Sequence, residues 1–312
     1  MNKIIYIAII AIILLPLDRL GLPVVTAPVA LLAGLIFAFT MKNPYPKFNK
    51  KCSKYLLQVA VVCLGFNMNL QESLRSGADG MLFTVVSVIG VMCLGVLFGY
   101  MLHINRKTSY LISSGTAICG GSAIAAVGPV LRADENEMAV SLGVIFILNA
   151  VALFIFPPLG HMLDMSQTQF GTWAAIAIHD TSSVVGAGEV YGEQALQMAT
   201  LIKLTRALWI IPLALVTMFI FRDGSGKVSI PWFIFLFILA MVANTYLPLP
   251  EWLTSALVWV ARRGMVVTLF LIGASLSLAT VKQVGVKPLL LAIALWVVIG
   301  VSSLFVVLNT IS

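Results

Sequence analysis

Long apolar runs recur from one end of this chain to the other, and they restrict the possible folds more than any motif does. The runs Met81–Leu102, Met138–Leu159 and Pro288–Leu308 have the length of about 20 residues that a helix needs to cross a bilayer. They do not alternate between apolar and polar residues, so they predict helices rather than barrel strands. Because only helices and closed barrels satisfy the backbone in lipid, we expect an all-α polytopic membrane protein with about 9–11 transmembrane segments.

The composition separates this chain from soluble proteins. Of its 312 residues, 60% are hydrophobic and 10% are charged, and the mean hydropathy is +1.04, whereas a soluble domain carries about 25% charged residues. The net charge of +7 does not indicate nucleic-acid binding, because the basic residues lie in short loops between apolar runs. The four cysteines lack metal-binding spacing, so we expect neither a disulfide framework nor a metal site.

The basic residues also predict how the chain is oriented. The most basic stretch lies between the predicted spans Leu22–Met41 and Tyr55–Leu70, and it holds Lys42, Lys47, Lys50, Lys51 and Lys54. Cytoplasmic loops are rich in Lys and Arg, so we expect this loop and the N-terminus on the cytoplasmic side of the membrane. The loop Arg222–Lys227 is predicted on the same side. The remaining predicted spans are Ile4–Leu17, Leu196–Phe221, Ile230–Tyr246 and Met265–Leu278.

Two of the apolar segments are interrupted by small and polar residues. The first reads GTAICGGSAIAAVGPVL from Gly115 to Leu131, and a shift of 60 residues aligns it with a second around Ile178–Gly188. This shift pairs Ser122 with Ser182. Interrupted membrane segments at corresponding positions in two halves of a chain are typical of a transporter's binding site.

A second internal similarity, at a shift of 208 residues, pairs Gly65 with Gly273 and Val59 with Val267. Counting crossings from the N-terminus makes the two copies antiparallel, as an inverted repeat requires. Each interrupted segment either crosses the membrane or returns as a re-entrant hairpin, and the inverted similarity favours hairpins or half-helices. We expect a core from 55–221 and 264–310, with broken segments at 107–131 and 171–191, and a scaffold from 1–41 and 228–262.

The glycines and hydroxyl residues of the interrupted segments predict a site for an anion. A half-helix that begins near Ser122 or Ser182 directs its free amides and its positive end towards the break, and such an end binds anions. Alternatively, the small residues only let helices pack closely. The predicted substrate-binding residues are Cys119, Gly120, Gly121, Ser122, Asn149, Thr181, Ser182, Ser183, Lys203 and Arg206.

Four ionisable residues lie in or just after the second interrupted segment. His179 and Asp180 are costly in lipid, and such residues are usually functional, so we expect them to couple transport to a proton or cation. Alternatively, Asp180 caps a half-helix. Lys203 and Arg206 are three residues apart and share one helix face. They need Asp180, an anionic substrate or both as partners, unless they extend to the membrane interface.

Four runs resemble the bacterial YeiH-like family, whose assigned substrate is sulfate. They are LGFNMNL (64–70), GTAICGGSAIAAVGPV (115–130), AIHDTSSVVGAG (177–188) and KLTRALWIIPLAL (203–215). The resemblance covers nearly the whole chain. It implies the superfamily of cation/proton antiporters and anion transporters, in which a mobile core with broken helices moves against a scaffold and homodimers are common. The matching motif residues are Cys119–Ser122, His179–Ser183, Lys203 and Arg206.

These observations predict a secondary transporter for a small anion, with sulfate, sulfite or a small organosulfonate as the leading substrate class. The sequence holds no ATP-binding motif, so we expect a proton or sodium gradient to drive transport, without another cofactor. One alternative is a cation/proton antiporter in which Asp180 titrates and Lys203 is its partner. Another is an intramembrane enzyme that uses His179, although no nucleophile and base have recognisable spacing.

Overall fold

The computed structural model describes residues 2–15, 25–41, 43–221, 232–275 and 284–311, without the side chains of 47, 50 and 72–83, and the regular elements in these residues are all helices. Five helical stretches are long and apolar enough to cross a membrane, and shorter apolar helices accompany them. The five stretches are Thr84–Met101, Glu135–Met162, Glu193–Ile220, Glu251–Ser275 and Val286–Thr310. The predicted all-α polytopic fold is confirmed.

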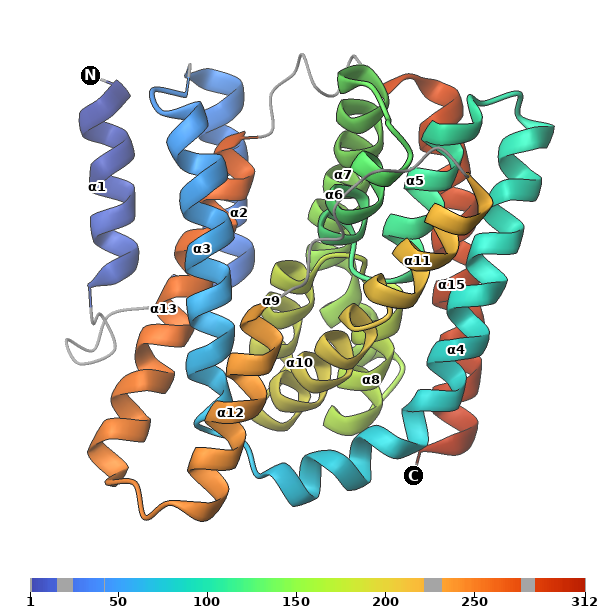
Figure 1. Ribbon diagram of the computed structural model, residues 1–312. Coiled ribbons are helices and arrows are strands. Elements are labelled where there is room, and N and C mark those ends of the chain that lie inside the picture. The colour runs from blue at the N-terminus through green and yellow to red at the C-terminus, as the bar shows by residue number, and fades with distance from the viewer. Residues whose placement is uncertain (1, 16–24, 42, 222–231, 276–283, 312) are drawn as a thin grey trace.

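One group of helices packs around α13 and is called the α13 bundle here (Figure 1, left). Close contact between α13 and α2 depends on two glycines, Gly34 and Gly273. A Cβ atom on Gly273 would lie only 2.6 Å from the carbonyl oxygen of Leu31, so only glycine allows this approach. The bundle contains α1 (Asn2–Leu14), α2 (Ala27–Thr40), α3 (Pro46–Gly65), α13 (Glu251–Ser275) and α12 (Trp232–Tyr246), which packs against α3.

The other helices form a second group, called the hairpin bundle, in which long helices surround four short ones (Figure 1, right). The long helices are α4 (Leu70–Met101), α7 (Glu135–Met162) and α15 (Val286–Thr310), and α10 (Glu193–Ala207) is continued by α11 (Ile210–Ile220). The short helices are α5 (Arg106–Ala117), α6 (Gly121–Val130), α8 (Gln167–Ala177) and α9 (Thr181–Tyr191). Helix α9 contacts α2 and α13 and so joins the two bundles.

Both interrupted segments are re-entrant hairpins. The start of α5 lies beside the end of α6, because Lys107 Nζ donates to the carbonyl oxygen of Arg132 at 2.9 Å. The start of α8 lies beside the end of α9, where the Tyr191 hydroxyl donates to the carbonyl oxygen of Met165 at 2.6 Å. The α5–α6 hairpin enters from the end of the molecule that holds the N-terminus, and the α8–α9 hairpin enters from the opposite end (Figure 1).

Local sequence explains where several of these helices begin and end. Asp134 and Glu137 form a capping box at the start of α7. Helices α4, α6 and α7 are followed by residues with positive φ, namely His103 at 54°, Arg132 at 49° and Asp164 at 49°. This left-handed conformation turns the chain sharply away from each helix axis.

Some predicted boundaries differ from the structure. Helix α3 begins at Pro46, so the lysines at 47–54 lie on its first turns rather than in a loop. Helix α13 begins at Glu251, 14 residues before the predicted span, because its charged and polar residues lower the hydropathy of that stretch. The predicted core included residues 55–65 of α3 and 264–275 of α13, and these residues pack in the α13 bundle. The division into a mobile core and a scaffold stays a prediction. The loop Arg222–Lys227 lies outside the described residues.

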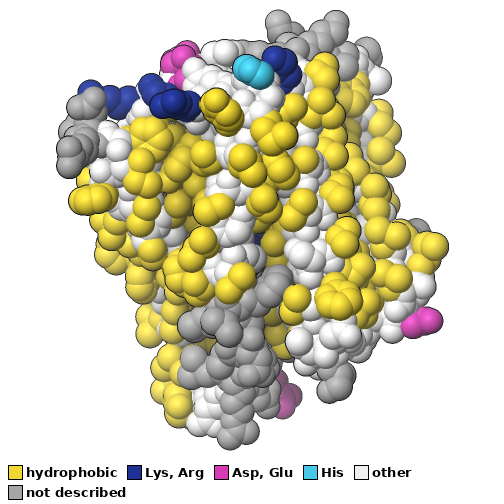
Figure 2. Space-filling model, turned by 90° about the vertical axis from the view of Figure 1, so that its right-hand side faces the viewer, with side chains coloured by type: hydrophobic (Ala, Val, Ile, Leu, Met, Phe, Trp, Pro, Cys, Tyr) yellow, Lys and Arg dark blue, Asp and Glu magenta, His cyan; other side chains and the backbone are white. Residues whose placement is uncertain are grey.

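The surface of the hairpin bundle agrees with a membrane location. Hydrophobic side chains cover the middle of the face shown in Figure 2, and Lys and Arg side chains gather at the upper end, where the N-terminus lies. Exposed apolar side chains on α4 and α15 include Val86, Ile89, Val297, Val301 and Phe305. A helix bundle in lipid turns such residues outward.

Candidate functional site

The two hairpins meet at their breaks, deep inside the hairpin bundle. Gly120 separates α5 from α6 with φ 64° and ψ −124°, a conformation that suits glycine. A Cβ atom at Gly120 would lie 3.3 Å from both the backbone nitrogen and the Cα of Asp180, which separates α8 from α9. The two breaks are therefore in direct backbone contact.

Arg206 binds the carboxyl-terminal end of α5. Its Nη2 donates to the carbonyl oxygen of Ala117 at 2.6 Å, and its Nη1 donates to the hydroxyl of Ser87 on α4 at 3.0 Å. The last carbonyl groups of a helix have no intrahelical partner and carry partial negative charge. A buried cation therefore stabilises the end that the break creates. The role of Ser87 was not predicted from the sequence.

Lys203 binds the carboxyl-terminal end of α8 in a similar way. Its Nζ donates to the carbonyl oxygens of Ile178 at 2.7 Å and Ala175 at 3.2 Å. Nearby, the indole nitrogen of Trp296 on α15 donates to the carbonyl oxygen of Ala177 at 3.1 Å. Lys203 and Arg206 are both fully buried. Both cations of α10 therefore bind helix ends inside the bundle and do not extend to a membrane interface.

The amino-terminal end of α9 has an acidic cap. The Asp180 carboxylate accepts hydrogen bonds from the backbone nitrogen of Ser182 at 3.1 Å and from the Ser182 hydroxyl. Asn149 on α7 supplies a hydrogen-bond acceptor for the backbone amides at the break between α8 and α9. Its Oδ1 accepts from the backbone nitrogens of His179 at 3.1 Å and Asp180 at 3.0 Å. Helix α6 begins after Gly120, which has no side chain to cap its amides.

The place where the two breaks meet, at Gly120 and at His179–Asp180, is called the crossing here. Several polar atoms at the crossing have no hydrogen-bond partner among the described residues. They are both ring nitrogens of His179 and the Nδ2 of Asn149. The His179 and Asn149 side chains are 1% and 3% exposed. An unpartnered buried polar group is costly, so these atoms favour a site that a ligand or ordered water completes.

The other predicted residues fall into two classes. Cys119, Thr181, Ser182 and Ser183 are buried at or beside the breaks. Ser122 is exposed on α6, so the two hairpins do not present their hydroxyl groups in the same way, although the sequence repeat pairs Ser122 with Ser182. Whether any of these residues binds a substrate stays a prediction. The described residues contain no group of three His, Cys, Asp or Glu side chains that could hold a metal ion.

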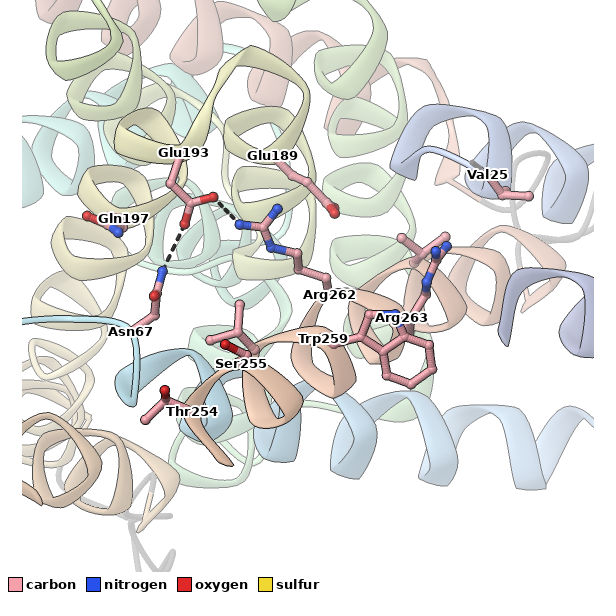
Figure 3. Close-up of a pocket in the computed structure, with 12 residues that line it drawn as sticks. Val25, Asn67, Glu189, Glu193, Gln197, Thr254, Ser255, Trp259, Arg262 and Arg263 are labelled. Carbon is pink, nitrogen blue, oxygen red and sulfur yellow. Dashed lines mark hydrogen bonds and ion pairs between the residues drawn. The ribbon is translucent and has the colours of Figure 1, made fainter. Parts of the chain in front are cut away.

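A cavity of about 600 Å³ lies between the two bundles, apart from the crossing (Figure 3). It is lined by residues of α13, by the end of α9 and by the start of α10. Sequence reasoning missed it, because its charged residues come from segments about 70 positions apart. The charged lining residues are Glu189, Glu193, Arg262 and Arg263.

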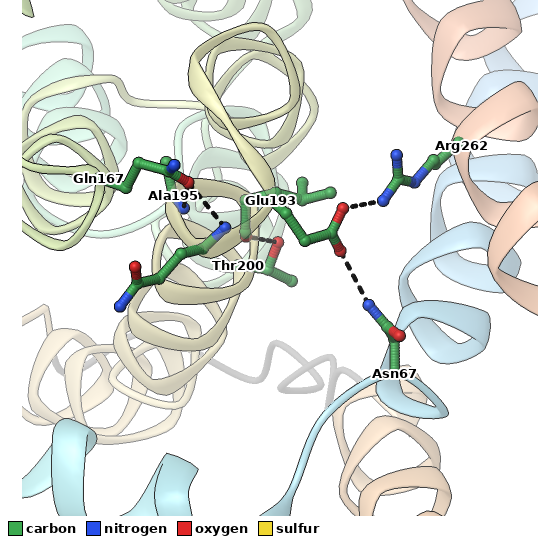
Figure 4. A network of polar contacts seen from close by, with 8 residues as sticks. Asn67, Gln167, Glu193, Ala195, Thr200 and Arg262 are labelled. Carbon is green, nitrogen blue, oxygen red and sulfur yellow. Dashed lines mark hydrogen bonds and ion pairs between the residues drawn. The ribbon is translucent and has the colours of Figure 1, made fainter.

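Glu193 joins the bundles at this cavity (Figure 4). Its carboxylate forms an ion pair with Arg262 on α13 and accepts a hydrogen bond at 2.8 Å from Asn67, which follows α3. On the other side of Glu193, the start of α10 is held to the start of α8. There the Gln167 side chain accepts from the backbone nitrogens of Gln194 at 2.9 Å and Ala195 at 3.3 Å.

Comparison with known proteins identifies the relatives of this chain. A sequence model of the family described as conserved hypothetical protein 698 matches residues 2–292. A UPF0324 membrane protein of Bacteroides thetaiotaomicron is 62% identical, over 97% of this chain and 94% of the relative. Another, of Porphyromonas gingivalis, is 56% identical over 91% of this chain and 87% of the relative.

A third UPF0324 membrane protein, Bd1437 of Bdellovibrio bacteriovorus, is 47% identical over 92% of this chain and 90% of the relative. No solved structure matches the chain. The relatives and the apolar helices agree that this is a membrane protein. The chain belongs to the UPF0324 membrane proteins, which are the YeiH-like family that its motifs resemble.

Proposed function

We propose that this protein is a secondary transporter that moves a small oxyanion across the bacterial inner membrane by alternating access. The observation that carries the proposal is the meeting of two hairpin breaks from opposite ends of the bundle at a buried polar crossing. Non-helical backbone at membrane depth is found where it is buried in protein or lines a cavity, and broken helices of this kind form transporter binding sites.

The charges at the crossing favour an anion over a cation. Lys203 and Arg206 carry two positive charges, and Asp180 carries one negative charge, so these groups sum to +1. The two helix amino termini and the two carboxyl termini at the crossing have opposite partial charges. A bound anion would offset this remaining positive charge. The α6 amides, the His179 ring and the Asn149 amide nitrogen would then donate hydrogen bonds to it.

The two bundles supply the parts that alternating access needs. The α13 bundle would act as the scaffold, and the hairpin bundle would move against it and carry the crossing towards one membrane face or the other. The relatives are named only as membrane proteins, so the substrate class comes from the site chemistry and from the sequence resemblance. Sulfate, sulfite and small organosulfonates are the oxyanions to be tested, with protons or sodium as the coupling ion.

Flux through proteoliposomes tests this proposal. The purified full-length protein should accumulate a labelled organosulfonate or sulfite when a proton or sodium gradient is imposed, and the substrate should be recovered chemically unchanged. Lys203→Met should abolish the flux, because it removes the charge while keeping a long side chain. Lys287→Met, at the exposed start of α15, is the matched control and should retain it.

Two results would oppose the anion-transport proposal. Movement of protons or sodium without any of the oxyanions would instead support an antiporter in which Asp180 titrates. Conversion of the substrate to a product would point to an enzyme. Equal flux in Lys203→Met and Lys287→Met would show that the crossing is not the transport site.

A further inference from the structure

The cavity between the bundles has charged and apolar sides that fit an organic ligand. Its volume of about 600 Å³ lies in the range of small-molecule sites, roughly 300–1,000 Å³. The apolar side is formed by the ring of Trp259 and by Val25, Val258 and Val266. A bare inorganic oxyanion would leave most of this space and this apolar surface unused.

On the Nε–Nη2 edge of the Arg262 guanidinium group, only one of the two nitrogens has a partner that the structure describes. Its Nη2 binds the Glu193 carboxylate, whereas its Nε is buried without a partner among the described residues. The Nε and Nη2 groups point in one direction and together bind a carboxylate or similar oxyanion through two parallel hydrogen bonds. The indole nitrogen of Trp259, on the preceding turn of α13, also lacks a partner within the described part of the chain.

Glu193 can leave Arg262 at little cost. The side chains of Glu193 and Arg262 are 46% and 38% exposed, and an ion pair this exposed contributes little to stability. When the Glu193 carboxylate turns to solvent, its charge stays at the cavity, where Arg262, Arg263, Glu189 and Glu193 sum to zero. The guanidinium edge of Arg262 then becomes available to another oxyanion.

We infer that this cavity binds a small monovalent organic oxyanion, a sulfonate or a carboxylate, which replaces Glu193 on the Nε–Nη2 edge of Arg262 and accepts a further hydrogen bond from Trp259. Its organic part packs against the apolar side of the cavity. The place of this site on the transport route rests on the proposed function, but binding to the cavity does not.

Binding at Arg262 would also loosen the contact between the bundles. Glu193 belongs to α10, while its partners Arg262 and Asn67 belong to the α13 bundle. An anion that takes the Arg262 edge leaves Glu193 without its cationic partner on α13. A ligand that occupies the cavity would therefore also break the Glu193–Arg262 ion pair, which connects α10 to the α13 bundle.

Calorimetric titration of the purified full-length protein with propanesulfonate, butyrate and sulfate tests the inference. Propanesulfonate and butyrate should bind, and sulfate should bind at least tenfold more weakly. Arg262→Lys should weaken binding at least tenfold, because an ammonium group lacks the two-pronged edge. Trp259→Phe should weaken it several-fold while keeping the ring in place.

Glu193→Gln gives the sharpest result, because the competing carboxylate is removed and propanesulfonate should bind several-fold more tightly. The matched control is Glu251→Gln, which removes an exposed carboxylate from the first turn of α13 that is not among the residues lining the cavity, and should leave the affinity unchanged. A Glu193→Gln affinity no higher than that of Glu251→Gln would overturn the inference. Unchanged affinity in Arg262→Lys, or no binding of either organic anion, would do the same.

Failure here differs from failure of the proposed function. Lys203→Met should stop flux while propanesulfonate still binds at the cavity. If Lys203→Met loses binding and Arg262→Lys does not, the anion binds at the crossing, and only the inference about the cavity fails. If the cavity binds propanesulfonate but no variant or condition gives flux, the proposed transport fails and the cavity site remains.

Discussion

Replacing Gly120 with alanine tests whether the hairpin breaks must touch. At φ 64° and ψ −124° the backbone of Gly120 lies where other residues are strained, at a cost of about 1–3 kcal/mol. The added Cβ would also lie 3.2 Å from Ile145 Cγ2 and 3.3 Å from the Asp180 backbone. These tight contacts add about 1 kcal/mol. We therefore expect Gly120→Ala to lower the free energy of unfolding by about 2–4 kcal/mol.

The assay is unfolding of the purified protein in mixed micelles by a denaturing detergent, followed by tryptophan fluorescence. The matched control is Gly300→Ala on α15, where an added Cβ would meet nothing within 4 Å. Alanine is the better helix former, so this control should be neutral or more stable by up to about 1 kcal/mol. A Gly120→Ala protein as stable as the Gly300→Ala protein would refute the close contact of the breaks.

Three further changes have expected effects on stability in the same assay. Asn149→Leu removes the acceptor of two buried amides and should destabilise the protein by about 2–4 kcal/mol; an unchanged transition would show that water replaces the amide. Gly273→Ala places a Cβ 2.6 Å from the Leu31 carbonyl oxygen and should lower the free energy of unfolding by about 1–3 kcal/mol. Unchanged stability would show that α13 moves away from α2 without a loss of packing. Arg132→Gly relieves a φ of 49° and should stabilise by up to about 1 kcal/mol; a loss of stability would mean that the arginine side chain has a structural role.

Much of the architecture could be predicted from the sequence. Apolar runs of membrane length predicted the helices. Glycines within one such run marked the break at Gly120, and the ionisable pair His179 and Asp180 marked the second break. The repeats favoured re-entrant hairpins, and the contacts at Lys107 and Tyr191 confirm them. The inverted relation between the halves stays a prediction. These features follow from local chemistry, because lipid forces each backbone group to find a partner nearby.

The partners of Lys203 and Arg206 were harder to predict. Their buried positions suggested an anionic side chain or substrate, whereas both donate to backbone carbonyl groups. A signal was present, because each broken segment creates a carboxyl-terminal helix end that attracts a cation. Two breaks followed by two cations on one helix fit that requirement.

The cavity at Arg262 could not be predicted in this way. Glu193 and Arg262 belong to different helices and are 69 positions apart, and one sequence carries no signal of which distant charges meet. The hydropathy pattern also did not predict the first half of α13, because a helix that borders a polar cavity is less apolar than one surrounded by lipid. The exposure of Ser122 depends on how α6 packs, which the repeat with Ser182 does not determine.

The attachment of both hairpins to α10 makes the spacing of Lys203 and Arg206 critical. One additional residue between them would rotate the following part of the helix by about 100° and shift it along the axis by about 1.5 Å. Arg206 would then face away from Ala117 while Lys203 still held Ile178, so one hairpin would lose its anchor. Evolution can therefore lengthen the loops around this helix but cannot insert a residue between these two positions. Any tilt of α10 would be transmitted to both hairpins together.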